Sequence, residues 1–153
     1  MPVTGLRPDG ERTTRNEGNG QMTDSKIDAV QRFYDGYARQ DMGAVLADLA
    51  DDVDWAAEAA GSAVPWYGSF SGKDEVPRFF KEIGNNVRIN EFTIVGLTSN
   101  ETDVVATVHW SYTVHTTGRT ATMYMQHWFR FADGKIVFFR GSEDSAQSVA
   151  AFA

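Results

Sequence analysis

The sequence predicts a single α+β domain in which an antiparallel β-sheet wraps around helices that come earlier in the chain. Three observations predict this class. Apolar residues recur at helical spacing in the first half of the chain, apolar and polar residues alternate through residues 104–131, and turns containing glycine separate the alternating stretches. Helices gathered first and antiparallel strands gathered last are typical of an α+β fold. The 153 residues suffice for one such domain with its own core.

The N-terminal residues are predicted to lie outside this domain. Residues 1–21 contain several Gly, Arg, Thr, Glu and Asn residues and hardly any apolar ones, so we expect a disordered tail. The folded domain is then residues 22–153. Met22 stands just before the helix-capping residues Asp24 and Ser25, which leaves two interpretations of the tail. It is either part of the natural protein or a segment ahead of the natural initiator, Met22.

Three helices are predicted in the first half of the domain. Residues 26–40 carry an inner stripe of Ile, Val, Phe and Tyr side chains at spacings of three and four. Asp41 is expected to cap a shorter helix that continues to about Ala50. A third helix is expected over residues 72–86, where Pro77 falls in the first turn and is tolerated because backbone N–H groups lack partners there.

The strand pattern is clearest in a predicted hairpin over residues 104–131. Every second residue of its first arm is apolar, and Gly118 supplies the positive φ that a tight turn needs. A two-residue turn at Thr117-Gly118 sets Val108 opposite His127 and Trp110 opposite Met125. The inward face of the second arm then consists of Met123, Met125, His127, Phe129 and Phe131. The other predicted elements are strands at 53–58, 89–98 and 135–142, a loop rich in aromatic residues at 59–71, and a final half-helix within 143–153.

The turn before the last strand has two geometries that the sequence allows. A three-residue loop with Gly134 in a bulge points Phe139 and Glu143 inward, whereas a two-residue loop points Phe138 and Arg140 inward.

Charge and composition exclude several partners. The formal net charge is −7, and an acidic domain without a basic stripe repels a phosphate backbone, so we expect no nucleic acid. No apolar run approaches the roughly 20 residues of a membrane helix, and no signal peptide is visible, so we expect no membrane partner. The chain has no cysteine, which fits a reducing compartment, and we expect a cytoplasmic protein.

Three runs carry a family resemblance: Ala-Asp-Asp-Val-Asp-Trp at residues 50–55, Val-Pro-Trp-Tyr-Gly-Ser-Phe-Ser-Gly-Lys-Asp-Glu-Val at 64–76, and Phe-Arg-Phe-Ala-Asp-Gly-Lys-Ile at 129–136. Together they resemble a SnoaL-like domain of the nuclear transport factor 2-like superfamily, which includes ketosteroid isomerases, polyketide cyclases and epoxide hydrolases. The resemblance covers residues 26–152. It implies a cone-shaped, curved antiparallel sheet closed by the N-terminal helices, a ligand pocket inside, and a homodimer through the outer sheet face at Tyr124 and Trp128.

The resemblance does not carry over the chemistry of the best-known relatives. The positions of the ketosteroid isomerase tyrosine, base and second aspartic acid fall on Phe33, Ala57 and His127. Limonene-type epoxide hydrolases use an Arg-x-Asp pair where this chain has Gln126-His127-Trp128. We therefore expect neither a steroid isomerase of the usual Asp/Tyr/Asp design nor that type of hydrolase.

His127 is the strongest candidate for catalysis, as a general acid or base or as a donor to an oxyanion. The alternative is a core histidine satisfied by a structural partner. Tyr34 or Tyr37 is the candidate for the missing hydroxyl, unless both simply pack. His109 and His115 share the outward face, roughly 20 Å apart by the strand rise, and His127 faces the other way, so we expect no metal and no cofactor.

The candidate ligand-binding residues come from the same inward faces and the aromatic loop. Glu58 is either a replacement carboxylate at the pocket mouth or a solvated strand end. The full set comprises Phe33, Trp55, Glu58, Trp66, Tyr67, Trp110, Met125, Phe129, Phe139 and Glu143.

Three functions are consistent with these residues. The first is a small-molecule enzyme acting on an apolar cyclic or polyketide-like substrate by general acid–base proton transfer. The second is a ligand-binding or accessory domain without catalysis, which the missing isomerase groups favour. The third is a protein-interaction module in which Tyr124 and Trp128 meet a foreign partner.

Overall fold

A computed structural model describes residues 3–4 and 24–153 of the chain. The predicted tail, residues 1–21, lies outside the described residues apart from residues 3–4, which pair with a later strand. The helices are α1 (Ser25–Ala38), α2 (Met42–Leu46), α3 (Val76–Asn86) and α4 (Ser145–Phe152). The strands are β1 (Val3–Thr4), β2 (Leu49–Ala57), β3 (Gly68–Ser69), β4 (Val87–Ser99), β5 (Asp103–Val114), β6 (Thr120–Ala132) and β7 (Lys135–Ser142).

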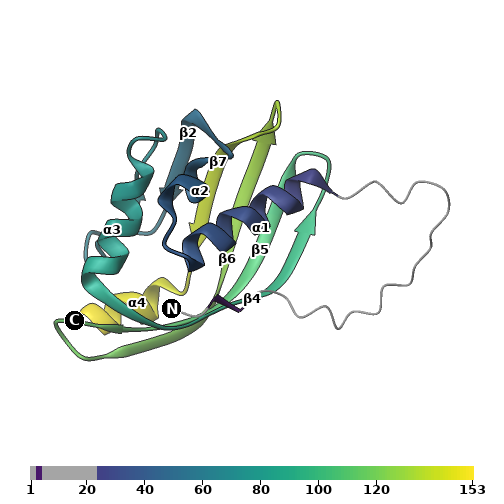
Figure 1. Cartoon of the computed structure of the whole chain (residues 1–153). Coiled ribbons are helices and arrows are strands. Elements are labelled where there is room, and N and C mark those ends of the chain that lie inside the picture. Colours follow the sequence, from purple (N-terminus) through teal and green to yellow (C-terminus); the bar gives the residue numbers. More distant parts are fainter. Residues whose placement is uncertain (1–2, 5–23) are drawn as a thin grey trace.

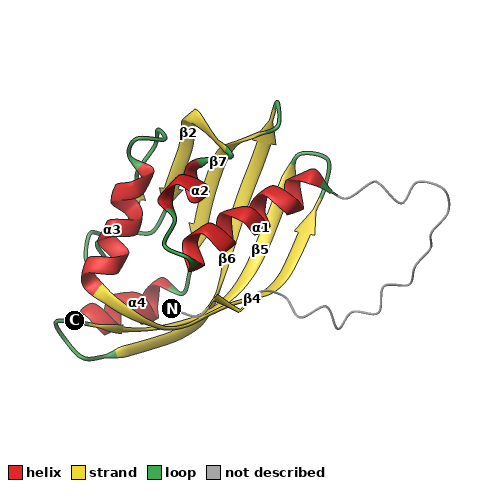
Figure 2. Cartoon of the chain, in the orientation of Figure 1, coloured by secondary structure: helices red, strands yellow, loops and turns green. Residues whose placement is uncertain are grey.

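The strands form one curved sheet in the order β1-β4-β5-β6-β7-β2-β3. Its centre is an antiparallel meander from β4 to β7, while β1 on β4 and β2 on β7 pair in parallel. Figure 1 and Figure 2 show α1, α2 and α3 packed over one side of this sheet. The predicted α+β class, with a curved sheet around the helices, is confirmed. The sheet is mixed because two pairs of strands are parallel. β2, which precedes the meander in the chain, lies beside the last meander strand, β7, and β1 lies beside the first, β4.

The first helix begins where the capping residues predict. The Asp24 carboxylate accepts from the backbone N–H groups of Lys26 (3.0 Å) and Ile27 (3.4 Å), which satisfies two donors of the first turn. The inner stripe of α1 is almost fully buried, at 0–3 % exposure for Val30, Phe33 and Tyr34. Burial of this stripe places aromatic side chains of α1 directly above the sheet.

The prediction that α2 continues to about Ala50 is wrong. The helix ends at Leu46, and Leu49 already begins β2, opposite Ile136 of β7. The backbone N–H of Ile136 also donates to the Asp48 carbonyl at 2.8 Å. Leu49 continues the helical spacing of this segment, but pairing with β7 gives its backbone a partner and still buries its side chain.

The predicted faces of the central hairpin are confirmed, but its predicted register is wrong by two residues. Val108 pairs with Met125, and His127 lies opposite Ala106. The reason is a longer connection, closed by a bond from the Val114 N–H to the Arg119 carbonyl (2.9 Å), in which Gly118 has φ +70°. A shift by an even number of residues keeps every side chain on its face, so His127 still points inward.

The last turn combines features of both predicted geometries. Asp133 and Gly134 form a two-residue loop with φ +51° and +76°. Phe131 then pairs with Ile136 but Arg130 pairs with Phe138, which leaves one extra residue, Val137, as a bulge. The bulge reverses the faces of the rest of β7. Phe139 is therefore buried at 1 % exposure, as the three-residue alternative predicted.

The final half-helix is confirmed as α4, which packs against the β5–β6 end of the sheet. The Thr117 hydroxyl donates to the Ala151 carbonyl (2.6 Å), and the Arg119 guanidinium donates to the carbonyls of Ala150 (3.1 Å) and Ala153 (2.6 Å). Among residues 24–153, no helix is long and apolar enough to span a membrane.

Candidate functional site

A cavity lies inside the cone, between the concave face of the sheet and helices α1 and α3. About 50 Å³ of it is open to the centres of water molecules, which is room for only a few waters. Ten of the predicted site residues line the cavity: Phe33, Tyr34, Tyr37, Trp55, Trp66, Trp110, Met125, His127, Phe139 and Glu143.

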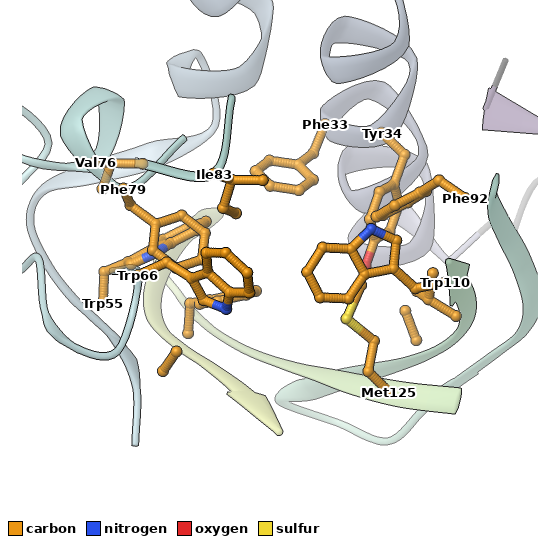
Figure 3. Close-up of a cluster of buried hydrophobic side chains, with 14 of the residues drawn as sticks. Phe33, Tyr34, Trp55, Trp66, Val76, Phe79, Ile83, Phe92, Trp110 and Met125 are labelled. Atoms are coloured by element: carbon orange, nitrogen blue, oxygen red, sulfur yellow. The ribbon is translucent and has the colours of Figure 1, made fainter. Parts of the chain in front are cut away.

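The wall is predominantly aromatic, and its rings come from elements far apart in sequence. Figure 3 shows Trp55 and Trp66 on one side of the buried cluster and Trp110 and Met125 on the other, with Phe33 drawn between the two groups. Trp55 stacks on Phe139 with ring centroids 3.8 Å apart. Such a wall offers flat apolar surface and few polar groups, so each polar group in it carries much of the chemistry.

The central polar contact joins Tyr34 of α1 to His127 of β6. The Tyr34 hydroxyl lies 2.7 Å from His127 Nδ1, and the two rings are nearly parallel. Burial lowers the pKa of His127 to about 4, and burial also raises the pKa of Tyr34 well above its ordinary value. Both side chains are therefore neutral near pH 7.

The hydrogen-bond partners favour one tautomer of His127. If the Tyr34 hydroxyl donates to Nδ1, the imidazole proton sits on Nε2, the nitrogen not engaged by Tyr34. If Nδ1 donates instead, the buried Tyr34 proton is left without an acceptor among the described residues. The first arrangement leaves fewer groups unpaired. In this arrangement the Nε2–H of His127 is a neutral donor that Tyr34 does not engage.

Glu143 brings a carboxylate to the same cavity, immediately after β7. Trp66 Nε1 donates to Oε1 (2.6 Å), and the Ser148 hydroxyl of α4 donates to Oε2 (2.7 Å). The Tyr112 hydroxyl in turn donates to Ser148 Oγ (2.6 Å). Burial raises the pKa of Glu143 above its ordinary value, although these donors oppose the effect. The result is a held carboxylate that is more basic than a surface glutamate.

Three predicted ligand-binding residues do not line this cavity. Phe129 is 0 % exposed and lies behind the wall, in contact with Phe33 and Phe139. Glu58 pairs with Arg140 at 3.0 Å and is exposed, and it lines with Tyr67 an adjoining pocket of about 220 Å³. That pocket shares Ala57, Gly141, Ser142 and Glu143 with the cavity, so it lies against the carboxylate end of the site.

Sequence reasoning missed several wall residues. Phe79, Phe80 and Ile83 recur at helical spacing on α3, but such spacing shows only that a face is buried and not which cavity it borders. Phe92 had a comparable signal in the alternation of β4. Ser148 had none, because its role depends on α4 folding back against a strand 36 residues earlier.

The described residues contain no cluster of three or more His, Cys, Asp or Glu side chains able to hold a metal ion.

Comparison with known proteins finds a matching family model and solved structures with the same fold. A family model described as a SnoaL-like domain matches residues 30–139. An NTF2-like protein of unknown function from Burkholderia pseudomallei is similar in structure, with 25 % identity, a TM-score of 0.78, and coverage of 86 % of this chain and 99 % of that one. A search of curated proteins finds no match.

Two other solved structures share the fold at lower identity. A Xanthomonas campestris protein provisionally named a polyketide cyclase has 22 % identity and a TM-score of 0.67, and the alignment covers 84 % of this chain and 97 % of that one. An epoxide hydrolase of the LEH-like type from M. tuberculosis has 18 % identity and a TM-score of 0.62, with coverage of 84 % and 89 %.

Proposed function

The chain belongs to the SnoaL-like domain family, and on that premise we propose that it catalyses proton transfer on an apolar cyclic or polyketide-like carbonyl compound. The observation that carries the proposal is the neutral Tyr34–His127 pair in an aromatic cavity that also holds the Glu143 carboxylate. A donor and a base on one apolar wall are the two groups that enolisation of a ketone needs.

His127 is assigned the role of the donor to the substrate oxygen. Its Nε2–H donates to the carbonyl, and the bond strengthens as negative charge develops on that oxygen. Full transfer of the proton is disfavoured because Tyr34 would have to supply a proton to Nδ1 and become a buried phenolate. His127 therefore stabilises the oxyanion by hydrogen bonding, and Tyr34 holds its tautomer.

Glu143 is assigned the role of the base. It accepts a proton from the carbon next to the carbonyl, the C–H electron pair moves into the enolate, and the carboxylic acid returns the proton to carbon. The register supports this arrangement, because Gly141 lies opposite His127 and Glu143 follows two residues later. Two residues of extended chain span about 7 Å, which leaves room for a carbonyl oxygen on His127 and for the adjacent carbon beside Glu143.

The test is hydrogen exchange at carbon. We expect the protein to accelerate exchange of the α-hydrogens of 1-decalone in deuterated buffer, followed by NMR. Glu143→Gln is expected to reduce exchange to the rate in buffer, and His127→Phe to slow it about a hundredfold. Glu101→Gln, which changes an exposed turn residue, is the matched control and is expected to exchange as the wild type does.

Exchange that continues at the wild-type rate in both Glu143→Gln and His127→Phe contradicts the proposal. Binding of 1-decalone without any exchange in the wild type supports the second candidate function, a non-catalytic ligand-binding domain. That candidate is favoured by the apolar residues Phe33 and Ala57 at two positions where ketosteroid isomerases carry catalytic groups.

The proposal includes a homodimer formed through the outer sheet face. Tyr124 is 63 % exposed and Trp128 37 %, although both are large and apolar. Trp128 is held in place by the hydrogen bond that its indole N–H donates to the Asp103 carboxylate (2.8 Å) and by an edge-to-face contact with the Phe138 ring. Sedimentation analysis is expected to give a dimer for the wild type and a monomer for Tyr124→Lys. A wild-type monomer contradicts the homodimer and favours a foreign partner on this face.

A further inference from the structure

We propose that the indole N–H groups of Trp55 and Trp110 are carbonyl-binding donors, so that the cavity takes a compact ring compound with at least two acceptor oxygens. This inference rests on the proposed function and specifies its substrate class. One acceptor oxygen is bound by each indole, and the His127 N–H shares one of these two oxygens, because a carbonyl oxygen has two lone pairs. The ligand class is therefore a cyclic diketone or a chemically similar polyoxygenated ring.

The two indoles are the buried tryptophan donors left unpaired. Trp55 is 0 % exposed and Trp110 3 %, and neither Nε1 has a hydrogen-bond partner among the described residues. The other two tryptophans form a contrast, since Trp66 donates to Glu143 (2.6 Å) and Trp128 donates to Asp103 (2.8 Å). Buried indole N–H groups usually find a partner, so two unpaired ones in residues that line the same cavity need an explanation.

Packing alone does not explain tryptophan at these positions. The same wall is otherwise built largely from phenylalanine, such as Phe33, Phe79 and Phe139, wherever ring surface suffices. An unpaired buried N–H costs stability, which phenylalanine would avoid. A partner that arrives with a ligand removes that cost.

Neighbouring rings hold both indoles in place. Trp55 stacks on Phe139 at 3.8 Å between ring centroids, with the two ring planes inclined by 14°. Trp110 lies against Tyr112 at 4.5 Å and against Trp66 at 5.7 Å. An indole fixed in this way does not turn toward solvent to find a partner, so the acceptor must come to the indole.

The position of the donors defines the shape of the ligand. Trp55 and Trp110 lie on opposite sides of the cluster in Figure 3, and His127 adds a third donor to the same cavity. An indole N–H donates and never accepts, so its complement is a carbonyl or similar oxygen. The narrow cavity favours a skeleton of one or two rings over a long chain.

The experiment compares three probes with one skeleton: decalin, 1-decalone and decalin-1,5-dione, which carry no, one and two acceptor oxygens. Affinities are measured by NMR titration, and the indole N–H signals are assigned with the variants Trp55→Phe and Trp110→Phe. We expect the dione to bind about tenfold more tightly than 1-decalone, and decalin to bind most weakly. The N–H signals of Trp55 and Trp110 are expected to move downfield with the dione.

The variants separate hydrogen bonding from ring volume. Trp55→Phe and Trp110→Phe are each expected to weaken dione binding about tenfold relative to decalin binding, because both probes respond alike to lost volume. Trp128→Phe removes an indole from the outer face and is expected to leave this ratio unchanged. If a cavity variant does not fold, the indole N–H signals are assigned by nuclear Overhauser contacts to neighbouring rings, and their shifts in the wild type decide the question.

Equal affinities for the three probes, or indole signals that stay in place while the dione binds, overturn the inference. The α-hydrogen exchange assay, run in parallel on the same samples, keeps the two proposals apart. Exchange without any indole effect overturns the substrate class alone. An indole effect without exchange overturns the catalytic proposal and leaves the ligand class standing.

Discussion

Replacing His127 by phenylalanine removes an imidazole that binds a proton more readily in the unfolded chain than in the folded protein. The pKa of this imidazole is lowered from 6.5 to about 4 by burial against Tyr34 and the aromatic wall. Between about pH 6.5 and pH 4 the unfolded chain therefore binds a proton at residue 127 that the folded protein does not bind. The wild type loses stability as the pH falls through this window, and the loss is complete below about pH 4.

The magnitude follows from the distance between the two pKa values. A difference of this size corresponds to about 3 kcal/mol of unfolding free energy, which the wild type loses and His127→Phe keeps. The variant also leaves the Tyr34 hydroxyl without its partner, which costs about 1–3 kcal/mol. That cost does not depend on pH in this range. It therefore lowers the unfolding free energy of the variant by the same amount at every pH and leaves the slope of unfolding free energy against pH unchanged.

The assay is urea denaturation of both proteins at a series of pH values from about pH 7 to about pH 4. The difference in unfolding free energy between wild type and variant is expected to change by about 3 kcal/mol across the series. The contribution of Glu143, which lines the same cavity, is common to both proteins. His115→Gln removes an exposed imidazole and is the control. Parallel curves for wild type and His127→Phe refute the burial argument.

Three further changes test the support of the site by urea denaturation near pH 7. Ser148→Ala leaves Glu143 Oε2 and the Tyr112 hydroxyl without their shared partner and is expected to cost about 2 kcal/mol, so an unchanged midpoint contradicts the network. Gly118→Ala imposes a side chain at φ +70° in open space and is expected to cost about 1 kcal/mol from backbone conformation alone. Gly36→Ala places a Cβ 2.8 Å from Ala44 Cβ and is expected to cost about 1–3 kcal/mol by forcing α1 from α2, whereas wild-type stability would mean that the two helices separate freely.

Side-chain faces were predictable from the sequence, and pairings were not. Alternation in the hairpin placed His127 on the inward face, and helical spacing placed Tyr34 on the inner stripe of α1. The register depends on loop length, and the hairpin connection is longer than the shortest turn that its glycine allows. The contact between Tyr34 and His127 spans 93 residues, so it depends on how α1 crosses the sheet.

The carboxylate end of the site was the least predictable part. Glu143 was among the candidates, but its partners Trp66 and Ser148 come from a loop without regular spacing and from the last helix. Neither segment has a periodicity that predicts that Trp66 and Ser148 donate hydrogen bonds to the Glu143 carboxylate. Leu49 shows that regular spacing can also mislead. Its spacing predicts a helix, but the residue lies in β2 and pairs with Ile136 of β7.

The single-residue bulge at Val137 has a consequence for how this hairpin changes length over evolution. Removing or adding one residue between Ala132 and Phe139 exchanges the two faces of β7 and turns Arg140 toward the aromatic cavity. Changes of two residues preserve the faces and alter only how far the turn projects. Length variation at this hairpin is therefore expected to be retained in even steps, so homologues with an odd difference must gain or lose a bulge at the same time.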